Sequence, residues 1–393
     1  MNHRERLLAL QSLLDAHRAM WRPQPFHVRR PAWCDEWPAL DAALRALDDA
    51  TLARFTEDPA AAQAWLAPQL PVLATLASLC DLPPLEPRPL PPCDVRFDGS
   101  IPGRKRAQIE AFVAHGPAAR APLVEWCAGK GHLGRRYALA DDVPVSALEI
   151  DPALCEEGVR LAARTGVAQT VICTDVLDGP PRPRVHGRSV VALHACGELH
   201  RTLVRSAARD GASSYQIAPC CYHLGVHEHY RPLSRDADLV LDAAALRLAV
   251  TETVTAPRGA RHRLARDQAW KLGFIALRDA LEGEALRPFK PVPARWLSGE
   301  FADFCRALAQ REGLRLPDRV DWAHWLAVGE RRRDVVRRLE LVRHAFRRAL
   351  EIWLVTDLAC GLVEAGFAVR LGTFCARSLT PRNVLVLAER RHA

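Results

Sequence analysis

A short apolar run leads into a glycine-rich turn in Val124-Glu125-Trp126-Cys127-Ala128-Gly129-Lys130-Gly131-His132-Leu133-Gly134, and the other elements of the chain can be ordered around it. The apolar residues meet a carboxylate, then small residues, and then a pattern suited to a helix. This order predicts a buried parallel strand that turns sharply into a helix and lets a ligand approach the backbone. We therefore expect a nucleoside-binding turn at residues 125–131, which we call the glycine turn.

Carboxylates follow three successive apolar runs. Glu125 closes the first run, Glu149 closes the second and Asp175 follows the third. Because ligands of an open parallel sheet bind beyond the carboxyl ends of the strands, we expect these side chains to meet. A carboxylate about twenty residues past a glycine turn suits ribose hydroxyls, and Asp175 suits the adenine. The alternative for Asp151 and Asp175 is a helix N-cap.

The spacing within the glycine turn argues against two other kinds of nucleotide site. Glu125-x-Cys127-x-Gly129-x-Gly131 lacks the three glycines of a dinucleotide turn, and Lys130 is not followed by the Ser or Thr of a phosphate loop. The pattern instead predicts S-adenosylmethionine as the cofactor. The predicted cofactor-binding residues are Glu125, Cys127, Gly129, Gly131, Glu149, Asp175, His194 and Cys196.

Strand-like runs alternate with helical patterns from Leu123 onward, which is typical of an open parallel sheet. The expected strands cover residues 123–125, 145–150, 170–173, 189–193 and 215–217, with a last pair at 366–371 and 383–388. The predicted fold class is α/β: a Rossmann-like class I methyltransferase sheet with a helical N-terminal domain and a helical insertion before the last two strands.

Domain boundaries follow from leucine spacing and from proline. Leucines recur at helical spacing over residues 1 to about 80, and the prolines of 81–103 cannot propagate a helix. We predict a helical N-terminal domain with a proline-rich linker at 1–95 and a methyltransferase domain at 96–393, whose helical insertion spans about 236–345. The N-terminal part is either a cap packed on the main domain or a substrate-recognition module.

An arginine-rich helix is expected before the final strand pair. Its apolar positions are Val335, Leu339, Val342, Phe346, Leu350 and Trp353, and most arginines lie elsewhere on the helix. Acidic residues such as Asp334 and Glu340 partly neutralise them. The pattern favours a solvated amphipathic face over a nucleic-acid-binding stripe.

Thiols and imidazoles gather after the fourth and fifth strands. They allow three interpretations: an acceptor pocket, a zinc site, or plain structural packing. Because no C-x-x-C clip occurs among them, we favour the pocket and predict no metal. The predicted catalytic residues are His194 and His223 as acid–base groups and Lys105 as a phosphate or orienting contact. The predicted substrate-binding residues are Pro219, Cys220, Cys221 and Tyr222.

The composition is that of an ordinary globular protein. The chain has 393 residues, 49% hydrophobic and 25% charged, and a formal net charge of +8 carried almost wholly by arginine. The charge is compatible with a polyanionic partner. Neither a signal-peptide core nor a membrane-spanning run is visible in the sequence. Twelve cysteines without secretory signals are expected to be reduced, so we predict a cytoplasmic protein with no membrane partner.

Three motifs and the tail resemble a known family. The motifs are Glu125-Trp126-Cys127-Ala128-Gly129-Lys130-Gly131-His132-Leu133, Leu193-His194-Ala195-Cys196-Gly197-Glu198-Leu199 and Ala218-Pro219-Cys220-Cys221-Tyr222-His223, and the tail is Leu371–Leu387 with Thr380-Pro381-Arg382-Asn383. They are similar to the methyltransferase-like protein twenty-five group, which shares its methyltransferase domain type with the glutathione S-transferase C-terminal-domain-containing protein. A more distant likeness runs to the transfer-RNA 2′-O-methyltransferases of the acceptor stem.

This resemblance covers about residues 100–393. It implies a class I methyltransferase domain that binds S-adenosylmethionine. The chain departs from the pattern at Cys127, which replaces the first glycine of the usual turn, and residues 1–100 lack the zinc-finger clip of the transfer-RNA enzymes.

The expected function is methyl transfer from S-adenosylmethionine, with RNA as the favoured acceptor and transfer RNA as a candidate within it. A protein or small-molecule methyltransferase is the second hypothesis. A catalytically silent S-adenosylmethionine-binding scaffold is the third. The oligomeric state is left open.

Overall fold

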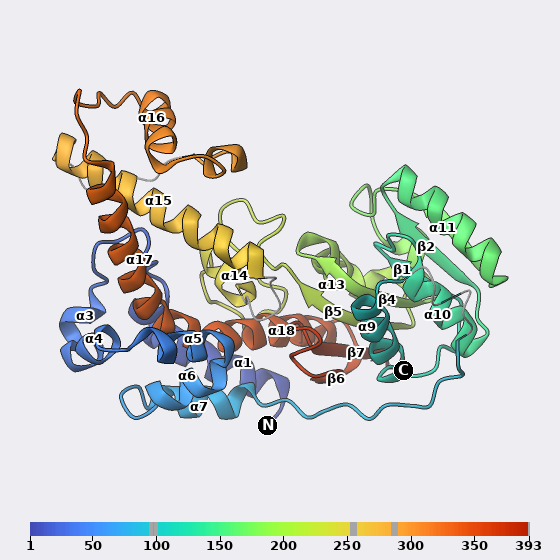
Figure 1. Ribbon diagram of the computed structural model, residues 1–393. Coiled ribbons are helices and arrows are strands. Elements are labelled where there is room, and N and C mark those ends of the chain that lie inside the picture. The colour runs from blue at the N-terminus through green and yellow to red at the C-terminus, as the bar shows by residue number, and fades with distance from the viewer. Residues whose placement is uncertain (94–96, 98–100, 252–257, 284–289, 392–393) are drawn as a thin grey trace. The chain divides into compact units, whose positions relative to one another are not determined.

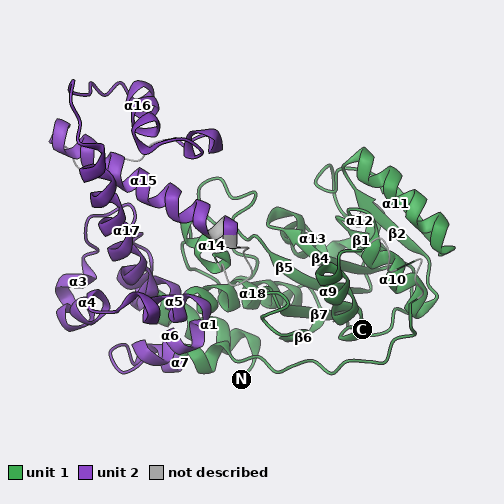
Figure 2. Cartoon of the chain, in the orientation of Figure 1, with its two compact units in different colours: residues 1–15, 76–251, 347–393 green, residues 16–75, 252–346 purple. Residues whose placement is uncertain are grey.

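The computed structural model describes residues 1–93, 97, 101–251, 258–283 and 290–391 (Figure 1). The chain forms two compact units, and each is built from separated segments (Figure 2). Unit 1 comprises residues 1–15, 76–251 and 347–393, and unit 2 comprises residues 16–75 and 252–346. The sequence-based division at residue 95 is continuous along the chain, whereas both of these units are discontinuous.

Unit 1 is organised around a seven-stranded sheet of order β3-β2-β1-β4-β5-β7-β6. Its first five strands are parallel, and β7 lies antiparallel between β5 and β6. The strands are β1 Leu123–Trp126, β2 Val145–Glu149, β3 Gln169–Cys173, β4 Ser189–Cys196, β5 Ser214–Cys220, β6 Phe367–Thr373 and β7 Val384–Arg390. All seven were expected, and the order reverses between β1 and β4, which is where ligands bind in such sheets.

Helices bury both faces of this sheet. The unit 1 helices are α1 His3–Ala16, which ends one residue past the unit boundary, α9 Gly103–Ala114, α10 His132–Asp141, α11 Pro152–Thr165, α12 Arg182–Val185, α13 Glu198–Asp210, α14 Ala243–Val250 and α18 Arg347–Glu364. Phe112 of α9 and Tyr137 of α10 pack with Val191 of β4 in one apolar cluster. The neighbouring strand residues Val190 and Ala192 point to the opposite face and are also buried. The α/β class with a methyltransferase-type sheet is therefore confirmed.

The proline-rich segment pairs with an edge strand of the sheet. The Leu85 N–H donates to the carbonyl of Thr373 at 2.9 Å, and the Thr373 N–H donates to the carbonyl of Pro83 at 3.0 Å. Proline is tolerated there because an edge strand needs hydrogen bonds on one side only. Residues 83–85 therefore belong to the packed structure of unit 1.

A buried carboxylate on α18 fixes the loop that follows β5. Asp357 is fully buried, and its two oxygens accept hydrogen bonds from Tyr230 Oη, Leu233 N, Ser234 N and Ser234 Oγ at 2.7–2.9 Å. Four donors satisfy a charge that burial alone would disfavour. This contact holds residues 230–234 against the helix that precedes β6.

Unit 2 is helical. It contains α2 Arg18–Trp21, α3 Trp33–Glu36, α4 Pro38–Arg45, α5 Asp49–Glu57 and α6 Pro59–Leu66 together with α15 Arg258–Glu282, η1 Ala294–Leu297, α16 Phe301–Glu312 and α17 Trp322–Ala345. Helix α7, Val72–Cys80, spans the boundary with unit 1. The apolar core around Trp270, Phe301 and Phe304 joins α15 to α16. The described residues between 258 and 346 thus form one unit with the helices of 16–75.

The expected single arginine-rich helix is wrong in two respects. First, it is two helices, because α17 ends at Ala345 and α18 begins at Arg347. Second, its arginines are not a solvated face: Arg338 donates to the Leu47 carbonyl at 2.8 Å, and Arg343 donates to the Trp21 carbonyl at 3.0 Å. Charge patterning gave no sign of these bonds, because the acceptors are backbone carbonyls distant in sequence.

None of the helices within the described ranges is both long and apolar enough to span a bilayer.

Candidate functional site

The glycine turn has alternating left-handed residues. Cys127, Gly129 and Gly131 have φ of 61°, 59° and 65°. These are the odd positions of the motif, so Cys127 takes the conformation that glycine would take at the first position, at a cost on the order of 1–2 kcal/mol. A Cβ added at Gly129 would meet no heavy atom within 4 Å, so this part of the turn faces open space. The turn therefore leaves room for a ligand near its backbone.

The carboxylate of Glu149 ties β2 to the glycine turn. One oxygen accepts a hydrogen bond from the Gly129 N–H at 2.7 Å, and the other accepts from the N–H groups of Ile150 and Asp151 at 2.9 and 3.0 Å. A carboxylate has roughly four lone-pair positions, so three backbone donors leave capacity for a ligand hydroxyl. Glu149 thus orients the glycine turn and keeps one acceptor position for a ligand.

The pKa of the Cys127 thiol depends on several of the predicted site residues. Burial raises its pKa to about 12, and the negative charges of Glu149, Cys196, Glu125 and Asp175 act in the same direction. The ends of β1, β2 and β4 and the segment after β3 therefore all carry groups whose charges act on this residue. Asp175 itself is exposed and accepts a hydrogen bond from the Leu177 N–H at 2.8 Å, which is also what a turn-capping residue does.

Glu125 is the buried carboxyl of the site. It is 4% exposed and accepts a hydrogen bond from the Gly134 N–H at 2.9 Å. A Cβ at residue 134 would lie 2.6 Å from the Glu125 Oε2 atom, so only glycine allows α10 to approach so closely. Burial raises the pKa of Glu125 to about 8, although the Gly134 hydrogen bond and the charges of Lys105 and Arg135 oppose this.

A β-bulge near the end of β4 presents His194. Leu193 pairs with Ala218 and Cys196 pairs with Cys220, so β4 has two residues where β5 has one. His194 takes φ of 64° in this bulge. Bulges re-aim side chains and are common beside active sites. Among the described residues, the non-glycine positions with positive φ are Cys127, Asp142, His194 and Cys221, and three of these four lie at strand ends of the candidate site.

The tautomer of His194 follows from its neighbour Gln108 on α9. The Gln108 Nε2 atom donates to the Leu379 carbonyl at 3.2 Å, which turns its Oε1 atom toward His194 Nε2, also at 3.2 Å. Since Oε1 can only accept, the proton sits on His194 Nε2 and Nδ1 keeps its lone pair. Burial, Lys105 and Arg382 lower the pKa of His194, so the ring is neutral at pH 7.

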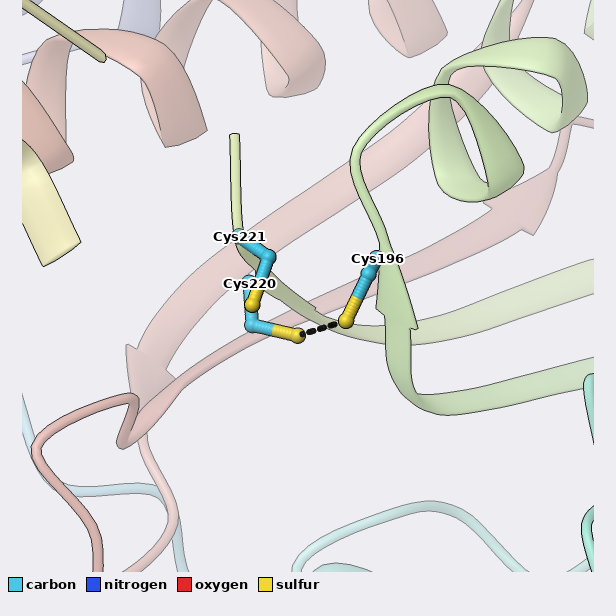
Figure 3. A group of neighbouring side chains, drawn as sticks. All are labelled: Cys196, Cys220 and Cys221. Atoms are coloured by element: carbon cyan, nitrogen blue, oxygen red, sulfur yellow. Dashed lines mark hydrogen bonds between the residues drawn. The ribbon is translucent and has the colours of Figure 1, made fainter. Parts of the chain in front are cut away.

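Three cysteine sulfurs lie together where β4 and β5 end (Figure 3). Those of Cys196, Cys220 and Cys221 are all within 4.8 Å of one another, and the Cys196 and Cys220 sulfurs are 3.1 Å apart. The hydrogen bond from Cys220 lowers the pKa of Cys221 to about 5, whereas Cys220 has a raised pKa as the donor. His223 lies near Cys221, and its buried Nδ1 has no hydrogen-bond partner among the described residues.

A buried arginine holds the loop that carries Cys221 and His223. Arg201 of α13 is 1% exposed and donates to the carbonyls of Tyr222 at 2.8 Å and Leu224 at 2.7 Å. Tyr222 is 2% exposed and packs edge-on against His200, so this predicted substrate-binding residue supports the loop from inside. Pro219 is likewise buried within β5. On this loop, Cys221 and His223 are the partly exposed members of the predicted set.

The structure thus brings most predicted residues to one edge of the sheet, and it adds three that sequence reasoning missed. Gln108, Arg201 and Arg382 contact or influence His194 or the cysteine loop. Arg382 lies in the tail motif Thr380-Pro381-Arg382-Asn383, so the sequence could have indicated it as a site residue. Gln108 and Arg201 stand on helices with no local signature that marks them.

Comparison with known families identifies the domain. Residues 105–227, which include β1 to β5, match a family described as a methyltransferase domain. The comparison with curated proteins gave no match. The chain therefore contains a methyltransferase domain of the S-adenosylmethionine-dependent class, as expected for the fold, the enzyme class and the cofactor.

Solved structures with similar chains include TYW2 of P. horikoshii in complex with MeSAdo, at 16% identity over 30% of this chain and 43% of that one, with a TM-score of 0.24. A TehB-like methyltransferase from Corynebacterium glutamicum is 12% identical over 28% and 60% of the two chains, with a TM-score of 0.23. Geranyl diphosphate C-methyltransferase from Streptomyces coelicolor A3(2) is 14% identical over 37% and 64%, with a TM-score of 0.24. The chain thus spans between 43% and 64% of these structures.

The raised pKa of Glu125 predicts a pH-dependent stability. Between its ordinary pKa of 4.5 and about 8, the folded protein binds more protons at this carboxyl than the unfolded chain does, so this contribution to the unfolding free energy falls as pH rises and levels off above 8. Relative to a Glu125→Gln variant, the wild type should lose on the order of 4 kcal/mol across this range. Urea unfolding at pH values from 5 to 9 measures the difference. The control Glu156→Gln, at an exposed position of α11, should follow the wild type, and parallel curves for wild type and Glu125→Gln would contradict the prediction.

Proposed function

We propose that the chain transfers the methyl group of S-adenosylmethionine to an RNA, with transfer RNA as the candidate within that class. The observation that carries the proposal is the basic start of α9, which lies at the edge of the sheet that also holds His194. Arg104, Lys105 and Arg106 are exposed there, and Lys105 contributes, after burial, to the lowered pKa of His194. Cations beside a base suit an acceptor that carries phosphates.

The residues around the glycine turn fit the cofactor. Glu149 would accept from the ribose hydroxyls, Asp175 from the adenine amino group, and the open side of Gly129 would receive the ligand near the backbone. When bound, S-adenosylmethionine supplies an electrophilic methyl group on a sulfonium. The contribution of the protein is then to hold the acceptor in line, which can account for much of the rate acceleration.

His194 is the proposed base for the acceptor hydroxyl. Its Nδ1 lone pair is available because Gln108 fixes the proton on Nε2. As the acceptor oxygen gains the methyl group, its proton passes to Nδ1. His194 is the catalytic residue in this proposal, and Gln108 is a positioning residue that sets the tautomer. Lys105 and Arg382, whose charges both act on the pKa of this ring, would hold the RNA backbone.

Two further assignments accompany this proposal. The motifs support placing the domain nearest the methyltransferase-like protein twenty-five group, with the acceptor-stem transfer-RNA enzymes as a more distant likeness. No disulfide joins any of the twelve cysteines, all of which the structure describes, and this supports a reducing compartment such as the cytoplasm.

The cofactor assignment predicts selective losses of affinity. Glu149→Ala and Asp175→Ala should each weaken S-adenosylmethionine binding by about 10- to 100-fold, because a hydrogen bond to a charged group contributes about 1.5–3 kcal/mol. Isothermal titration calorimetry measures the change. Asp151→Ala is the matched control, since this adjacent carboxylate caps α11 by accepting from Ala153 N. Unchanged S-adenosylmethionine affinity in both Glu149→Ala and Asp175→Ala would contradict the assignment of these residues to the cofactor site.

The base assignment predicts an effect on rate rather than on cofactor binding. His194→Ala should lower the transfer rate by about 10²- to 10⁴-fold and leave S-adenosylmethionine affinity nearly unchanged. Gln108→Glu places a carboxylate beside the ring and should raise the pKa of His194, so the acid limb of the pH–rate profile moves to higher pH. Gln108→Ala should lower the rate without that shift. A profile that is the same in Gln108→Glu and wild type would rule out His194 as the base.

The RNA assignment predicts where the methyl group goes. Incubation with methyl-labelled cofactor and separated RNA, protein and metabolite fractions should label RNA, with transfer RNA foremost. Label confined to protein or metabolites would refute the RNA proposal and leave the cofactor site intact. RNA affinity should also fall steeply with salt, and Lys105→Ala should reduce the salt slope by about one. Arg160→Ala, an exposed arginine paired with Glu157 on α11, should keep the wild-type slope.

A further inference from the structure

The cysteine cluster of residues 196, 220 and 221 has a geometry that the methyl-transfer chemistry does not require. Its three sulfurs come from the ends of two adjacent strands and lie within 4.8 Å of one another (Figure 3). In a tetrahedral zinc site the Zn–S distance is about 2.3 Å, which puts thiolate sulfurs about 3.8 Å apart. In the cluster one sulfur–sulfur distance is 3.1 Å and none exceeds 4.8 Å, a range that contains the separation in a zinc site.

Two backbone features create this cluster. The bulge in β4 places Cys196 opposite Cys220. Cys221 then takes φ of 46°, so that its sulfur lies beside that of Cys220 although neighbouring residues of an extended strand point to opposite faces. A C-x-x-C motif is not needed for such a site, because the three cysteines come from the ends of two strands.

We propose that Cys196, Cys220 and Cys221 bind a thiophilic divalent cation, Zn²⁺, at the carboxyl ends of β4 and β5. Three thiolates satisfy the preference of zinc for sulfur ligands and leave one tetrahedral position for another donor. Every cluster thiol that is still protonated releases its proton to water when the metal binds. This replaces the sequence-based expectation of no metal, which rested on the absence of a C-x-x-C clip.

The surroundings supply a second observation that points to a ligand. His223 lies near Cys221, and its buried Nδ1 atom has no hydrogen-bond partner in the part of the chain that is described. An imidazole nitrogen is the other preferred zinc donor. Arg382 also lies near Cys221, and its positive charge would offset the net negative charge of a zinc ion with three thiolates.

The cysteine cluster is partly exposed, and the loop that follows it is fixed by hydrogen bonds. Cys196 and Cys221 are half-buried whereas Cys220 is buried, so the cluster is not fully enclosed by protein. Arg201 fixes the loop after Cys221 through two backbone carbonyls. The ligands are therefore held by a rigid strand pair and a clamped loop, as a metal site needs.

Cobalt binding tests the proposal without reference to methyl transfer. The full chain, purified metal-free under a non-chelating reductant, is titrated with Co²⁺ and the sulfur-to-cobalt charge-transfer absorption is recorded. We expect one cobalt per chain, displaced by one equivalent of Zn²⁺. Cys196→Ser and Cys221→Ser should lower the affinity by at least about 100-fold, which exceeds the 10- to 100-fold effect typical of residues that only support ligands. Cys375→Ser, a half-buried cysteine outside the cluster, should bind as the wild type does.

Two results would overturn the proposal. One is reduced wild-type protein that takes up no cobalt or zinc while free thiols are counted in full. The other is unchanged cobalt affinity in both cluster variants. Circular dichroism of the metal-free variants shows that each is folded, and both substitutions are made at half-buried side chains rather than at the buried Cys220. Failure of RNA methylation would leave this result untouched, so the two proposals fail separately.

Discussion

One extra residue in β4 is the constraint on which the rest of the site depends. Between the pairs Leu193–Ala218 and Cys196–Cys220 the strand has two residues where its neighbour has one. The bulge turns His194 toward Gln108 of α9 and brings Cys196 to the sulfur of Cys220 at 3.1 Å. Without the bulge, every later side chain of β4 would change faces. The base and the thiol cluster therefore share one origin.

The site concentrates backbone strain and offsets it by nearby contacts. Cys127, His194 and Cys221 each have left-handed φ, a conformation that costs on the order of 1–3 kcal/mol for a non-glycine residue. Glu149 fixes the turn after Cys127 through the Gly129 N–H, and Arg201 fixes the loop after Cys221. Strain is tolerated where surrounding bonds over-determine the backbone. The departure at Cys127 therefore leaves the shape of the turn intact.

The sheet could be predicted from sequence because each strand is a local apolar run closed by a polar residue. Glu125, Glu149 and Asp175 stood out for the same reason, since their positions relative to the runs carry the signal. By contrast, the Gln108 contact joins residues 86 positions apart, and the bond from Arg201 to Tyr222 spans 21. The arginines of α17 were misjudged because a charged side chain that donates to a remote carbonyl looks, in sequence, like a solvated one. Hydrogen bonds between residues distant in the sequence leave no periodic pattern from which they could be predicted.

Because each unit is built from segments that are distant in sequence, neither unit can be completed until late in synthesis on the ribosome. Helices α4 to α6 emerge early, yet α15 and α17, against which unit 2 is completed, begin only at residues 258 and 322. At 5–20 residues per second this leaves roughly 10–40 s in which the apolar faces of the early helices have no final partner. Meanwhile β5 leaves the ribosome without β7, its antiparallel neighbour. Until the seven residues of β7 have been made, nascent chains of this protein thus expose apolar surface that the finished fold covers.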